Sequence, residues 1–354
     1  MILVLNAGSS SLKIEVFDAA LRSLIAGSVT NLGTAGALKL GEASTAIETR
    51  DHAHALALML AALAEAGYPL ASFTAAAHRV VHGGAILTQP ARVTDPIIKT
   101  IQSVIPLAPL HNPNNLAGID ALRATAPEMP QYCSFGTAFH ATNPDVAIRY
   151  AIPKTQHDAG IRRYGFHGLS YANMVADFGD ALPARLLAFH LGNGASLCAI
   201  REGQSIATSM GYSPLSGLTM GTRSGDIDGA AVLRMSKSLG EDETDRMLNK
   251  NSGLKALAGD NNMKTLLERD DPEARFAVEH FCYWAARNAG SAIVAMGEVD
   301  AVAFTGGIGE NAAPIRDRIM DLLGCFGELP VHVITADEEK QIARDALTLM
   351  AGGH

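Results

Sequence analysis

Cysteine is scarce in this chain of 354 residues, which contains Cys133, Cys198, Cys282 and Cys325. No two of them form a CxxC pair. Their wide separation gives neither the density of a disulfide scaffold nor the ligand spacing of a zinc site. We therefore expect four reduced thiols in a cytoplasmic protein.

Excess positive charge and long apolar runs are also missing. Lysine and arginine number 28 against 36 aspartates and glutamates, for a formal net charge of -8, so no overall basic field could hold a nucleic-acid backbone. The most apolar stretch, residues 55–77, is interrupted by Glu65, Gly67 and Pro69 and is too short to span a bilayer. The opening MILVLNAGSS lacks the basic start of an export signal. We expect neither nucleic acid nor a membrane as a partner.

What the chain does have is a globular composition, because 48% of its residues are hydrophobic. Its length predicts two domains at roughly 150 residues each. Apolar strands and helical segments are mixed along it, which predicts an α/β or α+β fold with a boundary near residues 145–155. We expect helices over 55–66, 116–126, 276–296 and 341–350, and strands over 74–81, 129–134, 301–305 and 331–335.

One pattern occurs twice at long range. VLNAGSSSLKIEVFD near the start and AFHLGNGASLCAIREG near residue 190 each run from an apolar strand through a small polar turn into a second strand. Aligning Ser11 with Ser196 places the copies 185 residues apart. Most such turns are only turns, but two similar hairpins at half-chain spacing predict two related domains that present matched loops to one cleft.

Three loops have the composition of anion or nucleotide sites: Asn6–Lys13, His190–Gly194 and Gly306–Asn311. Small residues let backbone N–H groups approach an oxyanion closely, and Lys13 adds a point charge. The chain has neither the GxxxxGK[ST] spacing of a P-loop nor GxGxxG after its first strand. The two commonest nucleotide folds therefore do not fit, and another phosphate-binding architecture is needed.

Seven motifs follow one another along the chain: MILVLNAGSSSLKIEVFD, HRVVHGG (78–84), APLHNP (108–113), RRYGFHG (162–168), HLGNGAS (190–196), MGTRSGDID (220–228) and FTGGIGEN (304–311). Together they resemble the acetate kinase family, which includes propionate kinases. The resemblance implies two duplicated α/β domains of the actin, sugar kinase and Hsp70 (ribonuclease H-like) type, closing on ATP. It also implies reversible transfer of the γ-phosphoryl group of ATP to a short carboxylate, giving an acyl phosphate and ADP.

The resemblance assigns Arg79 and Arg223 to the acyl carboxylate and the transferring phosphoryl group. A planar guanidinium stays charged and binds an oxyanion through two N–H groups, so arginine suits this role. His167 matches a histidine that donates to the phosphoryl oxygens, with His111 and His190 assisting. The alternatives are surface arginines paired with carboxylates and histidines buried in the core.

The remaining ligand contacts also come from the resemblance. Mg²⁺, which prefers oxygen ligands, is matched to Asn6 and Glu338, although Asp337 and Glu339 could equally be acids at a helix start. The acyl pocket is expected to involve Arg79, Val81, Leu110, His111 and Pro214, against the alternative of ordinary packing for the apolar members. The expected ATP or ADP contacts are Lys13, His190, Leu191, Gly192, Asn193, Gly194, Asn262, Met263, Lys264, Gly306, Gly307, Ile308, Gly309, Glu310 and Asn311.

The chain departs from the family pattern at four places, one of which is a shortened segment over Gly324–Pro330. Where the family reads FDTAFH, with an aspartate regarded as essential, this chain has Gly136. A family Asp-x-Arg becomes Asn262-Met263-Lys264, and the family's Thr-Ser-His after GFHG becomes Leu169-Ser170-Tyr171. The loss at Gly136 leaves an alternative open: a catalytically weak or inactive nucleotide-binding homologue that acts as a sensor or partner. RRYGFHG and MGTRSGDID speak against a third possibility, a sugar kinase or chaperone-like ATPase.

The resemblance further implies how the chain divides and assembles. We expect an N-terminal acyl-substrate and phosphate domain over residues 1–148, completed by a helix over 339–354. A C-terminal nucleotide-binding and dimerisation domain is expected over 149–338. The family's habit predicts a homodimer through this second domain, where residues 276–296 offer apolar surface. One methylene discriminates by only about 1 to 3 kcal/mol, so the sequence leaves acetate and propionate both open.

Overall fold

The computed structural model describes residues 1–352. The chain forms two compact units. The first unit comprises Met1–Ala138 together with the segment from Asp337 onward, and the second comprises Phe139–Ala336. The expected boundary at residue 148 lies ten residues further along the chain than this division. The C-terminal segment thus returns to the first unit.

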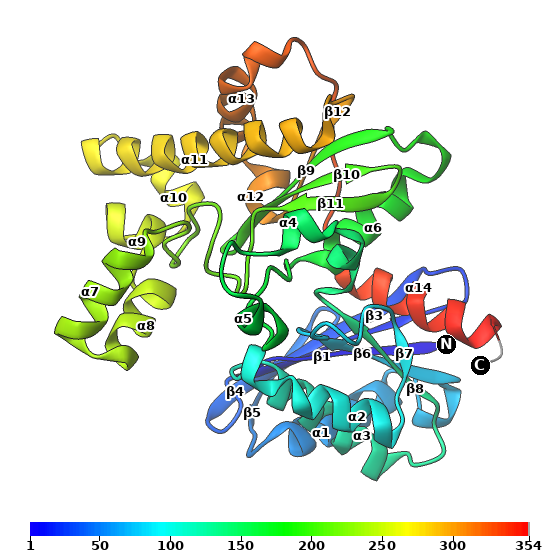
Figure 1. Cartoon of the computed structure of the whole chain (residues 1–354). Coiled ribbons are helices and arrows are strands. Elements are labelled where there is room, and N and C mark those ends of the chain that lie inside the picture. Colours follow the sequence, from blue (N-terminus) through cyan, green and yellow to red (C-terminus); the bar gives the residue numbers. More distant parts are fainter. Residues whose placement is uncertain (353–354) are drawn as a thin grey trace. The chain divides into compact units, whose positions relative to one another are not determined.

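The first unit contains a sheet of eight strands in the order β5-β4-β3-β2-β1-β6-β8-β7 (Figure 1). β1 is antiparallel to β2 and parallel to β6, which is in turn parallel to β8. The strands are β1 (Ile2–Ala7), β2 (Ser11–Phe17), β3 (Ser23–Thr30), β4 (Ala35–Leu40), β5 (Ala43–Glu48), β6 (Ala75–Val80), β7 (Ala91–Arg92) and β8 (Gln131–Phe135).

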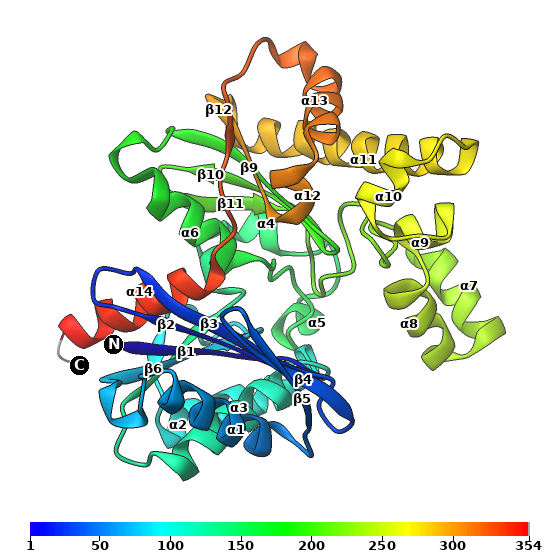
Figure 2. The same cartoon turned by 180° about the vertical axis from the view of Figure 1, so that it is seen from behind.

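Helices cover both faces of this sheet. α1 (His52–Glu65) and α3 (Asn112–Thr125) pack together on one face, where Leu3, Leu5 and Met59 join a buried apolar cluster. α14 (Glu338–Ala351) packs against β1, β6 and β8. Figure 2 shows α14 beside β1 and β6. Side-chain caps at Asp51 and Asp337 satisfy free N–H groups where α1 and α14 begin. The unit is completed by α2 (Asp95–Ser103) and the short 3₁₀ turns η1 (Leu70–Ser72) and η2 (Ile105–Leu107).

The second unit contains a sheet of five strands in the order β11-β10-β9-β12-β13. The strands are β9 (Arg185–Leu191), β10 (Ala195–Arg201), β11 (Gln204–Thr208), β12 (Ala301–Thr305) and β13 (Val331–Val333). The helices are α4 (Asp145–Ile148), α5 (Lys154–Asp158), α6 (Gly168–Phe178), α7 (Gly229–Leu239), α8 (Glu241–Lys250), α9 (Gly253–Ala258), α10 (Met263–Glu268), α11 (Pro272–Met296), α12 (Gly306–Asn311) and α13 (Ala313–Leu322). Short 3₁₀ turns follow β8, α6 and α13: η3 (Ala138–Thr142), η4 (Gly179–Ala181) and η5 (Gly324–Phe326).

The two sheets share one topology. The strand order β3-β2-β1-β6-β8 in the first unit corresponds, strand by strand, to the order β11-β10-β9-β12-β13 in the second unit. In both, an antiparallel hairpin opens the sheet and parallel strands follow it. The hairpins are the two copies of the repeat found in the sequence, so the prediction of two duplicated α/β domains is confirmed. Among the helices of residues 1–352, none combines the length and apolarity needed to cross a bilayer.

Candidate functional site

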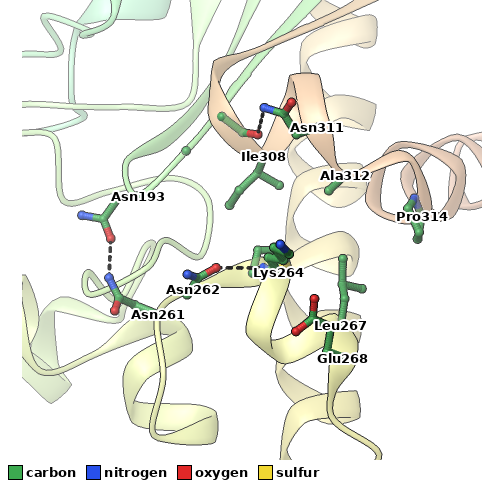
Figure 3. Close-up of a pocket in the computed structure, with 13 residues that line it drawn as sticks. Asn193, Asn261, Asn262, Lys264, Leu267, Glu268, Ile308, Asn311, Ala312 and Pro314 are labelled. Atoms are coloured by element: carbon green, nitrogen blue, oxygen red, sulfur yellow. Dashed lines mark hydrogen bonds between the residues drawn. The ribbon is translucent and has the colours of Figure 1, made fainter. Parts of the chain in front are cut away.

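A cavity of about 600 Å³ lies in the second unit, where the β9–β10 turn, the start of α10 and the start of α12 meet (Figure 3). The amide of Asn261 donates to Oδ1 of Asn193 across 2.9 Å, which joins two of these segments. Eight residues expected to contact the nucleotide line this cavity: Gly192, Asn193, Asn262, Met263, Lys264, Gly307, Ile308 and Asn311. The structure thus brings together three loops that are far apart in the sequence.

Glycine keeps part of the cavity wall open. A Cβ at Gly307 would meet no atom within 4 Å. Gly306 has a φ of +79°, and a Cβ there would lie 2.7 Å from the carbonyl oxygen of Leu191. Backbone from two strands therefore approaches closely at the end of β12, and only glycine fits there without strain.

Some of the expected nucleotide residues are not among those that line the cavity. Oε1 of Glu310 instead accepts from the backbone N–H of Gly306 at 3.0 Å and of Ala336 at 2.9 Å. That carboxylate holds the β12–α12 turn in place. Lys13 lies in the first unit and lines another pocket. The others outside the lining are His190, Leu191, Gly194, Gly306 and Gly309.

Five lining residues were absent from the sequence prediction: Asn261, Leu267, Glu268, Ala312 and Pro314. A signal for two of them was available. Leu267 and Glu268 follow Lys264 by three and four residues on α10, and side chains at that spacing share a helix face. Asn261 precedes the predicted Asn262 directly. Ala312 separates α12 from α13 and Pro314 lies in the first turn of α13; the motif gave no signal for either residue.

Beside the β9–β10 turn, two predicted side chains lie next to Gly194, and a third predicted residue stacks on one of them. A Cβ at Gly194 would lie 2.7 Å from Nη2 of Arg223 and 3.2 Å from Nε2 of His167. The rings of His167 and His190 stack with centroids 4.1 Å apart. A guanidinium and an imidazole therefore converge on one small space, which is the arrangement that a bound oxyanion needs.

The environment of Arg223 favours an anionic ligand. Burial lowers the pKa of its guanidinium from the ordinary value. Within residues 1–352, no carboxylate forms an ion pair with it; its Nη1 donates to the carbonyl oxygen of Pro214 at 2.7 Å. A desolvated cation without a charged partner is costly to maintain, and an anion at Gly194 would relieve that cost. Pro214, expected at the acyl pocket, is thus placed against Arg223.

Hydrogen bonds orient both stacked rings. Nδ1 of His167 lies 2.8 Å from Oγ of Ser196, which is 2.6 Å from the Tyr171 hydroxyl. Nδ1 of His190 lies 2.9 Å from Oγ of Ser170. These contacts join α6 to the β9–β10 hairpin, and no local pattern in the sequence indicated them.

In the first unit, α3 fixes the ends of two strands. Oδ1 of Asn115 accepts from the backbone N–H of Val81 at 3.0 Å, and its amide donates to the carbonyl oxygen of Ala7 at 2.7 Å. Asn112 bonds both backbone groups of His82. The HRVVHGG and NAGSSS loops, both expected to bind phosphate or substrate, are therefore held by the asparagines of NPNN.

Arg79 and Glu338 contact one another. Nε of Arg79 donates to Oε2 of Glu338 at 2.7 Å, and the two side chains are only 19% and 17% exposed. Burial alone would lower the pKa of Arg79, but the charges of Glu338 and Glu339 outweigh it and the pKa is raised. Two residues predicted for different roles, one for substrate and one for metal, form one partly buried ion pair.

Asn6, the other predicted metal ligand, faces the neighbouring acid. Its amide donates to Oε1 of Glu339 at 3.3 Å. Carboxylate oxygens of Glu15, Asp337 and Glu339 lie within 4.8 Å of one another. Burial, followed by the charges of Asp337 and Glu339, raises the pKa of Glu15. These oxygen donors are of the type that Mg²⁺ prefers, so the residues present fit a divalent cation.

The remaining predicted positions of the first unit differ in exposure. Leu110 is 60% exposed and His111, which precedes α3, is also exposed. Gly136 directly follows β8, and its N–H donates to the carbonyl oxygen of Val80 at 2.9 Å. A Cβ at Gly136 would lie 2.9 Å from the carbonyl oxygen of Val81. The backbone therefore approaches closely at the position where the family aspartate is missing.

Two sheets of the same topology, with a cavity and the Arg223 guanidinium beside the turn of the second hairpin, define a phosphotransferase of the actin and sugar kinase type. Comparisons with known proteins agree. Acetate kinase from Syntrophobacter fumaroxidans is 39% identical over 398 aligned residues, covering 98% of this chain and 96% of that protein. The structure of a propionate kinase from Francisella tularensis matches with a TM-score of 0.92 at 36% identity, covering 97% of this chain and 98% of that one. Porphyromonas gingivalis acetate kinase matches with a TM-score of 0.91 at 32% identity and 99% coverage of both chains.

The model of the acetokinase family matches residues 1–346. This chain belongs to the acetokinase family. It is accordingly a kinase, an enzyme that uses ATP or ADP with a small-molecule second substrate.

Proposed function

We propose that this kinase transfers the γ-phosphoryl group of ATP to acetate or propionate, giving an acyl phosphate and ADP, and that the reaction is reversible. The observation that carries the proposal is the partly buried Arg223, which has no ion-pair partner within residues 1–352 and lies beside Nε2 of His167 at Gly194. The names of the relatives, acetate kinase and propionate kinase, support the choice of acceptor.

The chemistry asks little of the protein beyond positioning and charge. A carboxylate oxygen of the acid attacks the γ-phosphorus while the bond to the bridging oxygen breaks, and ADP leaves with that electron pair. The acceptor is already an anion at neutral pH, so no proton has to be removed from it. Arg223 and His167 donate to the phosphoryl oxygens, and Arg79 holds the carboxylate. In this assignment the second unit binds the nucleotide through the cavity at Gly192 and the first unit binds the acid.

We further propose that Mg²⁺ is held by Asn6 and Glu338. Both supply oxygen donors, and Glu339 lies beside Asn6. A carboxylate can accept from Arg79 through one oxygen and bind a cation through the other. When bound, the ion supplies positive charge to the phosphate oxygens. The nearby carboxylates of Glu15, Asp337 and Glu339 add negative potential that favours a cation in this region.

The test is acyl phosphate formation. The full chain is incubated with ATP, MgCl₂ and single acids from two to four carbons, and the product is trapped as a hydroxamate with hydroxylamine. The expected result is saturable hydroxamate formation with acetate, propionate or both. Absence of product above a protein-free blank for every acid would refute the kinase assignment as given.

Gly136 favours a second candidate, a nucleotide-binding protein with little or no turnover. Without a side chain at this position, the first unit lacks the carboxylate that the family motif carries. Such a protein would bind ATP saturably by calorimetry and yield no hydroxamate. Both candidates predict ATP binding, so hydroxamate formation by the same sample is the measurement that separates them.

We also propose a homodimer in the cytoplasm. Apolar side chains on the second unit support the dimer, since Phe276, Tyr283 and Val294 of α11 are 58%, 51% and 77% exposed and Leu233 of α7 is 65% exposed. All four cysteines are unpaired thiols, as a reducing compartment requires. Sedimentation at micromolar concentration tests the assembly, and a monomer throughout would contradict it.

A further inference from the structure

Three side chains form a hydrogen-bonded chain behind the proposed phosphoryl site. The Tyr171 hydroxyl lies 2.6 Å from Oγ of Ser196, and that oxygen lies 2.8 Å from Nδ1 of His167. Tyr171 and Ser196 are both 0% exposed. His167 stands at the start of α6 with a φ of +58°, and Tyr171 follows in the first turn, its N–H bonded to the His167 carbonyl oxygen. Helix α6 and strand β10 thus hold the imidazole from behind.

The available acceptors fix the position of each proton in this hydrogen-bonded chain. Among the side chains of residues 1–352, the Tyr171 hydroxyl has one hydrogen-bond acceptor, Oγ of Ser196. Burial raises the pKa of Tyr171 well above its ordinary value of 10.0, so its proton is retained at neutral pH. If Ser196 donated to Tyr171 instead, the buried phenolic proton would have no acceptor, which is unfavourable. Tyr171 therefore donates to Ser196.

The order of the remaining protons follows. Ser196 has one hydroxyl proton, and with Tyr171 as its donor, this proton is directed to Nδ1 of His167. A neutral imidazole carries its proton on one nitrogen only, so Nδ1 accepts and Nε2 carries the N–H. The stacked ring of His190, whose centroid is 4.1 Å away, favours the neutral form of His167, because two cationic imidazoles at that distance would repel.

Nε2 is the nitrogen that faces the proposed site. It lies 3.2 Å from the place of a Cβ at Gly194, and Nη2 of Arg223 lies 2.7 Å from the same place. An N–H on Nε2 is a second donor to an oxyanion there, whereas a lone pair on Nε2 would repel it. The tautomer of His167 thus decides whether the site offers one donor or two.

We propose that Tyr171 is a positioning residue, whose hydroxyl acts through Ser196 to keep the proton of His167 on Nε2, where it can donate to the transferring phosphoryl group. The inference rests on the proposed function for the identity of the ligand, but the proton arrangement itself does not. The inference assigns a role to Tyr171, the last residue of Leu169-Ser170-Tyr171, which differs from the Thr-Ser-His of the family pattern. In this chain, the hydroxyl of a tyrosine supplies the orienting hydrogen bond.

The test combines a spectroscopic readout with kinetics. In ¹⁵N-labelled full-length protein, two-bond ¹H–¹⁵N correlations of the imidazoles distinguish protonated from unprotonated nitrogens, and a His167→Gln sample identifies the His167 signals. The wild type is expected to have the Nε2–H tautomer as its dominant form. In Tyr171→Phe the ratio of Nε2–H to Nδ1–H should fall by about fivefold to tenfold, as expected from the loss of one hydrogen bond. The kcat for hydroxamate formation should fall in proportion to the fraction of His167 in the Nε2–H form, a smaller factor than the fall in the tautomer ratio, while KM for ATP changes less than about twofold.

Two further variants separate this role from simple packing. Because Tyr171 acts through Ser196, Ser196→Ala should shift the tautomer as well, and adding Tyr171→Phe to Ser196→Ala should cause no further loss of kcat. Tyr164→Phe is the matched control: it also removes a buried hydroxyl near the same loop, one that donates to the Gly160 carbonyl oxygen at 3.0 Å, but it leaves Ser196 untouched. Its His167 spectrum should match that of the wild type.

The outcomes distinguish this inference from the proposed function. An unchanged His167 tautomer in both Tyr171→Phe and Ser196→Ala overturns the inference, whatever the enzyme's activity. Additive losses of kcat in the double variant also overturn it. If the wild type forms no hydroxamate but the tautomer shifts as described, the proton arrangement stands and the kinase assignment fails.

Discussion

Nε of Arg79 and Oε2 of Glu338 are 2.7 Å apart in a partly buried ion pair that links β6 to the start of α14. The pair predicts a stability cost when one partner is neutralised. Glu338→Gln should destabilise the first unit by about 3 kcal/mol because the poorly solvated guanidinium loses its hydrogen-bonded counter-charge and keeps only the neighbouring charge of Glu339. Chemical denaturation measures this effect. Glu339→Gln is the control, since it neutralises the adjacent acid without touching that hydrogen bond, and an equal loss in both variants would contradict the prediction.

Gly136 gives a prediction about activity. A Cβ at this position approaches the Val81 carbonyl oxygen at 2.9 Å, so any side chain there forces a small backbone shift that costs about 1 kcal/mol or more. Gly136→Ala measures that cost alone. Gly136→Asp adds the carboxylate and should raise kcat at least about tenfold over Gly136→Ala, equivalent to about 1.4 kcal/mol. Equal kcat in the two variants would show that the carboxylate gives no gain in this loop.

The cavity gives a prediction about nucleotide affinity. Gly307 lines it, and a Cβ there meets open space, so Gly307→Val should fill ligand volume without distorting the fold. KM for ATP is expected to rise about tenfold, the equivalent of a moderate steric penalty, while KM for the acid stays within a factor of about two. Gly290→Val is the matched control, because a Cβ at Gly290 of α11 also meets nothing within 4 Å but lies outside the cavity. An unchanged KM for ATP in Gly307→Val would place the nucleotide elsewhere.

Buried histidines predict how stability depends on pH. Burial lowers the pKa of His78, His82 and His140 from 6.5 to about 4. In the unfolded chain these rings bind protons below about pH 6.5, whereas in the folded protein they stay neutral until about pH 4. Stability is therefore fully present above pH 6.5 and falls as the pH drops toward 4, by at most about 3 kcal/mol for each ring.

Calorimetric unfolding temperatures between pH 7 and pH 5 measure this decline. His78→Gln removes one titrating group, whose Nε2 lies 2.8 Å from Oε1 of Gln131. Unfolding of this variant should take up one proton fewer, so its unfolding temperature should decline less steeply with falling pH. A decline of unchanged steepness in that variant would mean that other groups dominate the acid response.

Much of the fold could be predicted because the signals for it are local. Alternating apolar residues and glycine-rich turns located both hairpins, and the expected helix over 276–296 lies within α11. The two hairpins differ in the length of their turns. The sequence aligns Ser11 with Ser196. Strand pairing places Leu12 opposite Ala7 and Ala195 opposite Leu191, so four residues separate the paired positions in the first hairpin and three in the second. Turn length differs between the copies, and sequence identity at small residues cannot reveal that.

The site was predictable where motifs bind through backbone or small side chains, as at Gly192, Asn193 and Gly307. It was not predictable where distant segments complete one another. The contacts of Ser196 with Tyr171 and His167 cross from a strand to a helix, and the pairing of Arg79 with Glu338 spans 259 residues. Such contacts depend on the tertiary arrangement, about which local spacing carries no information.

Helix α14 belongs to the first unit although it is synthesised after all of the second. Its buried residues Ile342, Ala343 and Ala346 cover β1, β6 and β8. During translation, one face of the N-terminal sheet therefore remains without its cover until the ribosome has made residues 338–351. The N-terminal domain of a multidomain chain usually completes folding first, but here the intervening unit has all of its residues before the first unit does.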